Sequence, residues 1–241
     1  MNGKLKLTPA ARPVPTKKLR IEEVPRTLRE LALEKMRAAI VEFHFRPGQR
    51  LVERDLCEQL GVSRSVVREV IRHLEAEGLV HTVPHSGPIV AKLDAETAAQ
   101  IYELRSLLES AAAQAAATHA SADDIARMGA ALDAIGAAYR QKDFHNVLAA
   151  TNSFYEVMFL CAGKSVAWEM VQRLNGRISW LRSLTVSSVD RGATGPVQMR
   201  KILNAITERD GAAAAAACRD HLATAGQIAQ RLIAAETIAA G

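Results

Sequence analysis

Apolar residues recur at the three- and four-residue spacing of a helix through most of this chain. In the first third, the pattern predicts three helices, at residues 27–42, 53–60 and 63–78. Two short apolar runs, 79–83 and 89–91, flank the segment Pro84-His85-Ser86-Gly87-Pro88 and predict a β-hairpin. Three helices followed by a hairpin predict a winged helix-turn-helix domain.

From Asp94 onwards the chain carries only helical periodicity. It predicts six helices that begin near residues 94, 121, 143, 165, 196 and 211, with the fourth extending to Val186 and a polar loop at Ser187–Pro196. Amphipathic helices joined by short loops favour an antiparallel bundle, whose core commonly binds a small ligand. The fold class expected is mostly α, with a winged helix-turn-helix at residues 26–93 and a helical effector-binding and dimerisation domain at 94–241.

Composition supports this division of the chain. Hydrophobic residues make up 49% and aromatic residues 4%, with alanine abundant towards the C-terminus, which favours packed helices. The formal net charge is +5, but residues 1–93 hold 17 Lys/Arg against 11 Asp/Glu, whereas residues 94–241 hold 14 against 15. The basic excess belongs to the predicted winged domain, as a polyanion such as DNA requires.

Residues 1–25 form a basic, proline-containing segment with little apolar periodicity, and a flexible arm is expected. It is either a solvating tail or an arm that follows DNA phosphates or enters the minor groove. The cysteines, Cys57, Cys161 and Cys218, make no CxxC pair and are expected as apolar packing residues in a reducing compartment. No apolar run can span a membrane and the polar N-terminus has no signal-peptide core, so a cytoplasmic protein is expected.

The segment GVSRSVVREVIRHLEAEG, which begins at Gly61, predicts the helix that reads DNA bases. Gly61 suits a left-handed helix end, and Ser63 suits the N-cap of the next helix. Arg64, Arg68 and Arg72 lie four apart, so they form a cationic stripe away from the apolar face. An ordinary helix with a solvated basic face would show the same stripe, but the preceding helix, the turn and the hairpin favour DNA binding.

The first part of the chain closely resembles the DNA-binding domain of the GntR family of bacterial regulators, through LVERDLCEQLGVSRSVVREVIRHLEAEGLV. The helical part resembles the C-terminal ligand-binding (FCD) domain of the FadR subfamily, through YELRSLLES, KDFHNVLAATNSFYEVMF, MRKILNAITERD and CRDHL. These resemblances span about residues 26–240. They imply a homodimer that binds a double-stranded DNA operator of twofold symmetry and responds to a small-molecule effector.

The resemblance also implies which residues contact DNA. Arginine can bind guanine O6 and N7 with two hydrogen bonds, and serine can bind a base or a phosphate. The small residues of the hairpin tip allow a close approach to the DNA, whereas the histidine there is as often only solvated. By position, the implied DNA-binding residues are Arg54, Ser63, Arg64, Ser65, Arg68, His85, Ser86 and Gly87.

Many FadR-subfamily proteins hold a divalent metal with an Asp, a His four residues later, and one His from each of two later helices. In this chain those positions fall on Thr151, Tyr155, Met199 and His221, of which only His221 is a usual metal ligand. A divalent cation needs stronger ligands to offset the loss of its water shell. We therefore expect no metal and no cofactor, and four residues that converge on a cavity for an organic ligand. His145 is expected to be an ordinary surface or packing histidine.

Arg105 falls where the family often has an arginine facing the effector. An arginine among apolar neighbours is costly to bury without an anionic partner. That partner is either the carboxylate of a ligand or Glu109, which lies four residues later on the same predicted helix. The expected effector is a small carboxylate bound by Arg105, with polar contacts from Thr151, Tyr155 and His221. Met199 and Trp180 are expected on the apolar wall, and Arg177 and Arg182 face either the cavity or the solvent.

The chain is therefore predicted to be a ligand-responsive regulator, most often a repressor in this family, that a small organic acid releases from a palindromic operator. One alternative is a constitutive DNA-binding protein whose helical domain only dimerises. Another is a metal-dependent sensor of the same family. An enzyme is not expected, because the sequence has no glycine-rich phosphate loop, no nucleophile elbow and no paired carboxylates in a plausible site.

Overall fold

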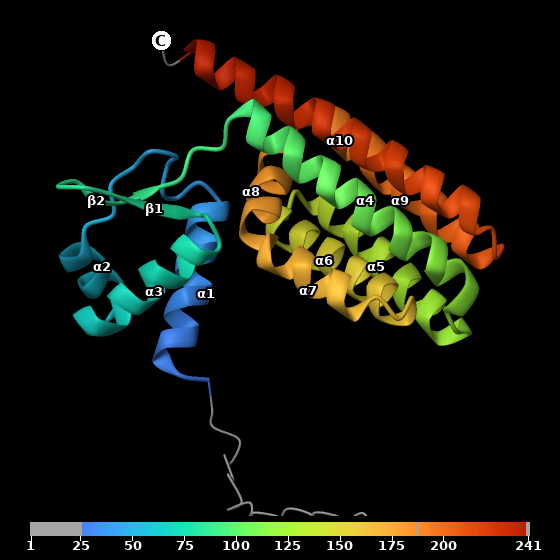
Figure 1. Cartoon of the computed structure of the whole chain (residues 1–241), viewed down its shortest axis with the longest axis horizontal. Coiled ribbons are helices and arrows are strands. Elements are labelled where there is room, and N and C mark those ends of the chain that lie inside the picture. Colours follow the sequence, from blue (N-terminus) through green and yellow to red (C-terminus); the bar gives the residue numbers. More distant parts are fainter. Residues whose placement is uncertain (1–25, 187, 240–241) are drawn as a thin grey trace, which may run out of the picture.

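The computed structural model describes residues 26–186 and 188–239, which contain ten helices and one two-stranded sheet. Figure 1 shows two lobes, a winged helix-turn-helix and a helical lobe, joined by the segment that leads from β2 into α4. The predicted mostly α fold class is confirmed. The arm expected at residues 1–25 lies outside the described residues.

The winged lobe consists of α1 (Leu28–Val41), α2 (Glu53–Leu60), α3 (Arg64–Ala76), β1 (Val80–Val83) and β2 (Gly87–Val90). At the start of α1, the Thr27 hydroxyl oxygen accepts from the Glu30 backbone N–H, and the Glu30 carboxylate accepts from the Thr27 backbone N–H. The two strands pair antiparallel, with Val80 opposite Val90, and form the predicted wing. The core of the lobe is apolar and comes from all three helices, including Met36, Ile40, Leu56, Val67, Val70 and Leu74.

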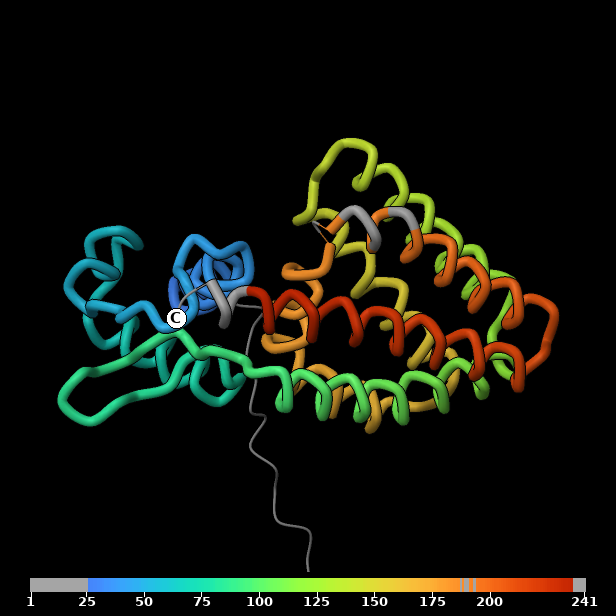
Figure 2. The backbone as a smooth tube through the Cα atoms, turned by 90° about the horizontal axis from the view of Figure 1, so that it is seen from above, coloured from blue at the N-terminus to red at the C-terminus, as the bar shows by residue number. Residues whose placement is uncertain are grey.

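The helical lobe consists of α4 (Ala95–His119), α5 (Ala122–Gln141), α6 (Phe144–Cys161), α7 (Ser165–Arg173), α8 (Asn175–Val186), α9 (Val189–Thr207) and α10 (Gly211–Ala239). The long helices α4 and α10 lie side by side, α9 packs beside α10, and α5 pairs with α6 (Figures 1 and 2). The side chains of Asp94, Ser121 and Asp143 cap α4, α5 and α6, as their N-terminal positions predict.

The helical lobe departs from the sequence prediction in two places. The single helix predicted at residues 165–186 is divided at Leu174 into α7 and α8, so the lobe has seven helices among its described residues. The predicted loop at 187–196 is wrong from Val189 onwards, because α9 begins there and Pro196 lies inside it. Ser188 caps this helix, its hydroxyl oxygen accepting from the Arg191 backbone N–H at 3.3 Å. The segment is polar and lacks apolar periodicity, so hydrophobic spacing does not reveal the helix.

The two lobes meet where α8 packs against the end of α1 and the turn between α3 and β1. Trp180 stacks at a tilt on Phe43, with ring centroids 5.8 Å apart. Gly176 lies so close to Leu79 that an added Cβ would come within 2.9 Å of its side chain. Arg177 lies against the α3–β1 turn. Trp180 is therefore not on the cavity wall as predicted, and Arg177 faces the junction between the lobes rather than the cavity.

His145 and the cysteines occupy ordinary structural positions. The His145 side chain is 67% exposed, and its Nδ1 lies 2.8 Å from Glu42 Oε1 across the same junction, so its prediction as a surface histidine is confirmed. Cys57 and Cys161 are half-buried, Cys218 is buried, and all three are free thiols. Within the described ranges, no helix has the length and apolar character needed to cross a membrane.

Candidate DNA-binding surface and effector cavity

The turn between α2 and α3 fixes the direction of the predicted recognition helix. Gly61 ends α2 with φ 65° and ψ 33°, a left-handed conformation that glycine adopts without steric cost. Ser63 then caps α3, its hydroxyl oxygen facing the Val66 backbone N–H. The helix buries Val67, Val70, Ile71 and Leu74, and it leaves its basic side chains exposed, namely Arg64, Arg68 and Arg72.

Four predicted DNA-binding residues already have side-chain contacts on this surface. Arg68 Nε lies 3.0 Å from both carboxylate oxygens of Glu53 in α2, so this pair ties the two helices together. The Ser63 and Ser65 hydroxyls lie 2.9 Å apart. Arg54 Nε lies 3.2 Å from Oδ1 of its neighbour Asp55. These exposed groups are available to a DNA phosphate or base edge.

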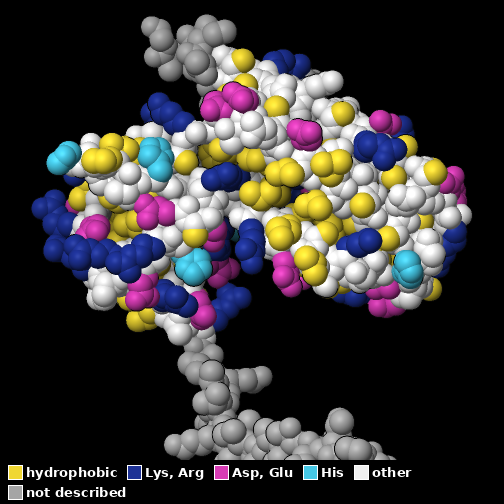
Figure 3. Space-filling view, in the orientation of Figure 1, with side chains coloured by type: hydrophobic (Ala, Val, Ile, Leu, Met, Phe, Trp, Pro, Cys, Tyr) yellow, Lys and Arg dark blue, Asp and Glu magenta, His cyan; other side chains and the backbone are white. Residues whose placement is uncertain are grey.

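Arg64 differs from its neighbours, because it makes no ion pair or side-chain hydrogen bond with any residue in the described part of the chain. It is exposed at the first position of α3, where recognition helices contact base edges. Figure 3 shows dark blue Lys and Arg side chains gathered over α2 and α3 at the outer side of the winged lobe. This surface is suited to a polyanion.

The wing tip projects from the same lobe. His85 and Gly87 have φ of 65° and 81°, so the tip turns through left-handed conformations. The backbone N–H of Ser86 donates to the Val83 carbonyl at 3.1 Å and closes the turn. His85 is exposed at the tip, and the adjacent Ser86 and Gly87 are half-buried. A narrow tip of small side chains suits an approach to a DNA groove.

The helical lobe encloses a cavity of about 30 Å³ that is lined by residues from six of its helices, α4, α5, α6, α8, α9 and α10. Four of the five predicted effector-binding residues line it: Arg105, Thr151, Met199 and His221. Tyr155 does not. Its ring lies behind the cavity, 5.9 Å from the guanidinium carbon of Arg105 and 5.0 Å from that of Arg182.

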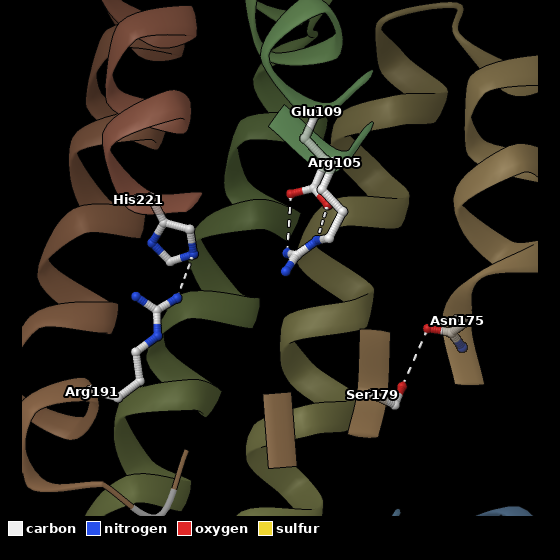
Figure 4. Close-up of polar contacts among 6 residues, drawn as sticks. All are labelled: Arg105, Glu109, Asn175, Ser179, Arg191 and His221. Carbon is white, nitrogen blue, oxygen red and sulfur yellow. Dashed lines mark hydrogen bonds and ion pairs between the residues drawn. The ribbon is translucent and has the colours of Figure 1, made fainter. Parts of the chain in front are cut away.

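Arg105 and Glu109 form a fully buried ion pair within α4. Arg105 Nε donates to Glu109 Oε1 at 2.7 Å, and Nη2 donates to Oε2 at 3.3 Å (Figure 4). Burial lowers the pKa of Arg105, but the charge of Glu109 and the nearby Tyr155 and Tyr102 outweigh it, so the pKa lies above its usual value. The guanidinium therefore faces the cavity with its partner carboxylate already in place.

Two further arginines line the cavity: Arg182, for which the sequence left cavity and solvent open, and Arg191, which the sequence did not assign to it. Arg182 comes from α8, and burial together with the charge of Arg105 lowers its pKa to about 10. Arg191 comes from α9, and burial lowers its pKa too. The spacing of Ile178, Leu181 and Thr185 places Arg182 on the inward face of its helix, a signal present in the sequence. Arg191 was missed because its segment was predicted to be a loop.

His221 is held as a neutral imidazole in the cavity wall. Arg191 Nη2 lies 2.8 Å from His221 Nε2 (Figure 4), and burial followed by the charge of Arg191 lowers the pKa of His221 well below 6.5. Since Nε2 accepts from Arg191, the proton is on Nδ1, which is buried and has no hydrogen-bond partner. The hydroxyls of Tyr102 and Tyr155 are likewise buried without a partner.

These residues do not fit a divalent metal. Arg191 occupies the Nε2 side of His221, and the Thr151 hydroxyl donates to the Val147 carbonyl of its own helix at 2.7 Å. No group of three or more His, Cys, Asp or Glu suitable for a metal occurs among the residues the structure describes. The donor set is instead rich in N–H and O–H groups, which are the partners of an organic anion.

Comparison with known proteins agrees with this architecture. Residues 28–90 match the family model for bacterial regulatory proteins of the gntR family, and residues 100–224 match the FCD domain. The Nta operon transcriptional regulator of Aminobacter aminovorans is 41% identical over 86 residues, 36% of this chain and 41% of that protein. An uncharacterized HTH-type transcriptional regulator of Agrobacterium vitis is 33% identical over 136 residues, 55% of this chain and 80% of that protein.

The galactonate operon transcriptional repressor of Escherichia coli (strain K12) is 28% identical over 200 residues, 73% of this chain and 85% of the repressor. The crystal structure of a protein of Rhodococcus sp. RHA1, described as a GntR transcriptional regulator, superposes with a TM-score of 0.72 at 25% identity, covering 83% of this chain and 96% of that one. The fold and these matches define a DNA-binding transcriptional regulator. The chain belongs to the GntR family and carries the FCD domain of the FadR-like subfamily.

Proposed function

We propose that this regulator is a repressor that binds a palindromic operator as a homodimer and is released by a small organic acid. The observation that carries this proposal is the cavity, which is lined by the buried Arg105 and the half-buried Arg182 and Arg191, with Glu109 as the carboxylate paired to Arg105. The similarity to the galactonate operon repressor supports the repressor role. Arg105 is proposed to bind the acid with its remaining N–H groups, and Thr151, Met199 and His221 to complete the site, whereas Tyr155 lies behind it against Arg105 and Arg182.

On the DNA side, Arg64 and Arg68 are proposed to read bases in the major groove, with Ser63 and Ser65 beside them. Arg68 would exchange its exposed pair with Glu53 for a base or phosphate, an exchange of low cost because surface ion pairs contribute little. Arg54 is proposed to bind phosphate. The wing residues His85, Ser86 and Gly87 are proposed to contact the adjacent groove.

A second copy of this chain is proposed to pack against α4 and α7. Exposed apolar side chains lie on both helices: Leu104 and Leu107 on α4, and Val166 and Met170 on α7. The two helices are neighbours, and Figure 3 shows hydrophobic side chains gathered on this face of the helical lobe. Exposed apolar patches of this kind are typical of interfaces, and two recognition helices match a twofold operator.

Helix α8 is proposed to carry the response from the cavity to the winged lobe. Arg182, Thr185 and Val186, in its second half, line the cavity, whereas Gly176 and Trp180, in its first half, contact the winged lobe. An anion that draws Arg182 inwards would shift a helix that has no free space at Gly176. Tightly packed elements move as units, so the shift would change the position of the winged lobe.

The test is operator release measured with the purified full-length protein. Fluorescence anisotropy on its own operator, with a panel of small carboxylic acids, should find at least one acid that dissociates the complex and raises the melting temperature. A chelator should change neither value, because the site does not depend on a metal. Acids that neither stabilise the protein nor release DNA would instead favour a constitutive DNA-binding protein. Loss of the response on chelation would favour a metal-dependent sensor.

A further inference from the structure

We propose that the effector of this cavity carries two negative charges, and that Arg182 and Arg191 bind the second charge. This inference rests on the proposed function, because it specifies the acid that the cavity takes. It follows from the count of buried charges, from the donors that lack partners and from the size of the cavity.

Three guanidinium groups face one small cavity from three different helices: Arg105 from α4, Arg182 from α8 and Arg191 from α9. Glu109 is the one carboxylate that forms an ion pair with any of them in the described part of the chain, and it pairs with Arg105. His221 is neutral and adds no charge. The site therefore holds two uncompensated positive charges, which are costly in a buried environment.

Arg182 has no acidic partner in the described ranges, and its guanidinium instead lies over the face of Tyr155, 5.0 Å from the ring centroid. A ring face attracts a cation only weakly compared with a carboxylate. The charge of Arg105 also repels Arg182, and this repulsion adds to burial in lowering the pKa of Arg182. An anion beside Arg182 would remove both penalties.

Within the described part of the chain, the acceptors that hold Arg191 are neutral. Its two terminal nitrogens lie 2.8 Å from His221 Nε2 and 3.3 Å from Gln198 Oε1. A carboxylate oxygen is a stronger acceptor for a guanidinium than an imidazole or an amide, because the bond is charge-assisted. An acid can therefore displace His221 from Arg191, and the N–H of His221 Nδ1 and the Tyr102 hydroxyl are buried donors without partners at the cavity.

The cavity volume of about 30 Å³ restricts the ligand to a small molecule, since it corresponds to roughly one or two waters. Even a small diacid is larger than this volume, so side chains of the cavity wall must move apart to admit it. We expect Arg191 and His221 to separate when it binds. A short dicarboxylic acid and inorganic phosphate can both supply the two negative charges that the site requires. The geometry favours the diacid, because Arg182 and Arg191 come from different helices and lie beside separate partners.

The test compares ligands that differ in charge but not in shape. Malonate and succinate are titrated into the full-length protein by calorimetry and thermal shift, beside their monoamides malonamate and succinamate, and beside inorganic phosphate. We expect at least one dicarboxylate to bind about tenfold or more tightly than its monoamide. A larger effect of phosphate than of either dicarboxylate would identify the dianion as phosphate-like.

The variants Arg182→Gln and Arg191→Gln should each reduce the preference for the dianion over its monoamide to less than about threefold. Arg182→Lys keeps the charge and should keep most of the preference. Arg200→Gln is the matched control, because Arg200 is exposed and pairs with Asp133 outside the cavity. Circular dichroism checks that each variant is folded, and the wild-type comparison of the acid with its amide stands even where a variant does not fold.

The outcomes separate this inference from the proposed function. If a monoamide binds as tightly as its diacid, or if the glutamine variants keep the preference for the dianion, the two-charge site is refuted while a small-acid effector stands. If neither diacids, monoamides nor phosphate bind, both the inference and the small-acid effector fail.

Discussion

Glu109 is the side chain on which the charge balance of the cavity depends. It is fully buried, and it accepts two hydrogen bonds from Arg105 on the same helix. The sequence left two partners open for Arg105, Glu109 or a ligand. Glu109 and a ligand can bind Arg105 at the same time. A guanidinium has five N–H donors, and Glu109 accepts from only two of the three guanidinium nitrogens. Arg105 can thus remain paired with Glu109 and still donate to the proposed effector.

Glu109→Gln should therefore destabilise the ligand-free protein by about 3–5 kcal/mol, since it leaves Arg105, Arg182 and Arg191 without a buried countercharge. Urea unfolding followed by circular dichroism measures this loss. A dianion that binds the cavity should restore part of it, because the ligand supplies the missing charge. Glu103→Gln, an exposed position on the same helix, is the control and should change stability little. Equal stability of the two variants would contradict the charge balance described here.

Arg64→Ala should reduce operator affinity by about 1–3 kcal/mol, because a free arginine at the start of the recognition helix is proposed to bind a guanine. The loss should be specific to the operator, so random DNA of equal length should lose less. Fluorescence anisotropy on both DNAs at fixed salt gives the two values, with Arg200→Ala as a control outside the winged lobe. An unchanged preference for the operator would show that the assigned register of the helix on DNA is wrong.

At the scale of helices and strands, local signals account for what the sequence predicts well. Some helix ends can be predicted because they depend only on residues within four positions of each other. Examples are the Thr27 capping box, the left-handed Gly61 and the Asp94 cap. The break at Leu174 and the start of α9 are not predicted, because the apolar stripe continues through Leu174 and because the segment after Ser188 lacks apolar periodicity. Trp180 shows the same limit, since the sequence predicts it on the apolar wall of the cavity, whereas Phe43 of the other lobe covers it.

Gly176 tests whether α8 connects the two lobes. Gly176→Ala places a Cβ 2.9 Å from the Leu79 side chain, so that side chain, α8 or the α3–β1 turn must move. We expect a loss of about 1–3 kcal/mol in stability, a nearly unchanged affinity for the acid, and weaker release of operator by that acid. Calorimetry measures the affinity for the acid, and fluorescence anisotropy measures the release of operator, so the two effects can be separated.

Gly129→Ala is the matched control for this substitution. It also replaces a helical glycine, but its Cβ would meet only Leu203, at 3.9 Å. It should stabilise the protein by about 0.4–1 kcal/mol and leave the response intact. A normal operator response in Gly176→Ala, together with the expected loss of stability, would remove α8 from the coupling path.

At the scale of the whole molecule, the two lobes divide recognition between them. The exposed cations that are proposed to face DNA lie on α2 and α3, and the buried and half-buried arginines lie around the cavity of the other lobe. The charge asymmetry of the sequence predicts the first set, because exposed charge adds up in composition. The charge asymmetry does not predict the cavity arginines, because the helical lobe is nearly neutral as a whole and these arginines come together only in the folded lobe. A small winged lobe also has little apolar surface to spare, so we propose that the helical lobe provides the dimer contact.

The proposed dimer face can be tested without knowing the effector. Leu107 is 64% exposed on α4, and Leu107→Glu places a charge in the apolar face shared with α7, where a second copy would bury it. Light scattering should report a monomer for this variant, and operator affinity should fall by more than about tenfold, because one recognition helix reaches only one half-site.

Val197, which is 58% exposed on α9, provides the matched substitution Val197→Glu on a different helix. That variant should remain a dimer with unchanged affinity. A dimeric Leu107→Glu beside a monomeric Val197→Glu would move the interface to α9, and a wild-type monomer bound to operator would refute the homodimer itself.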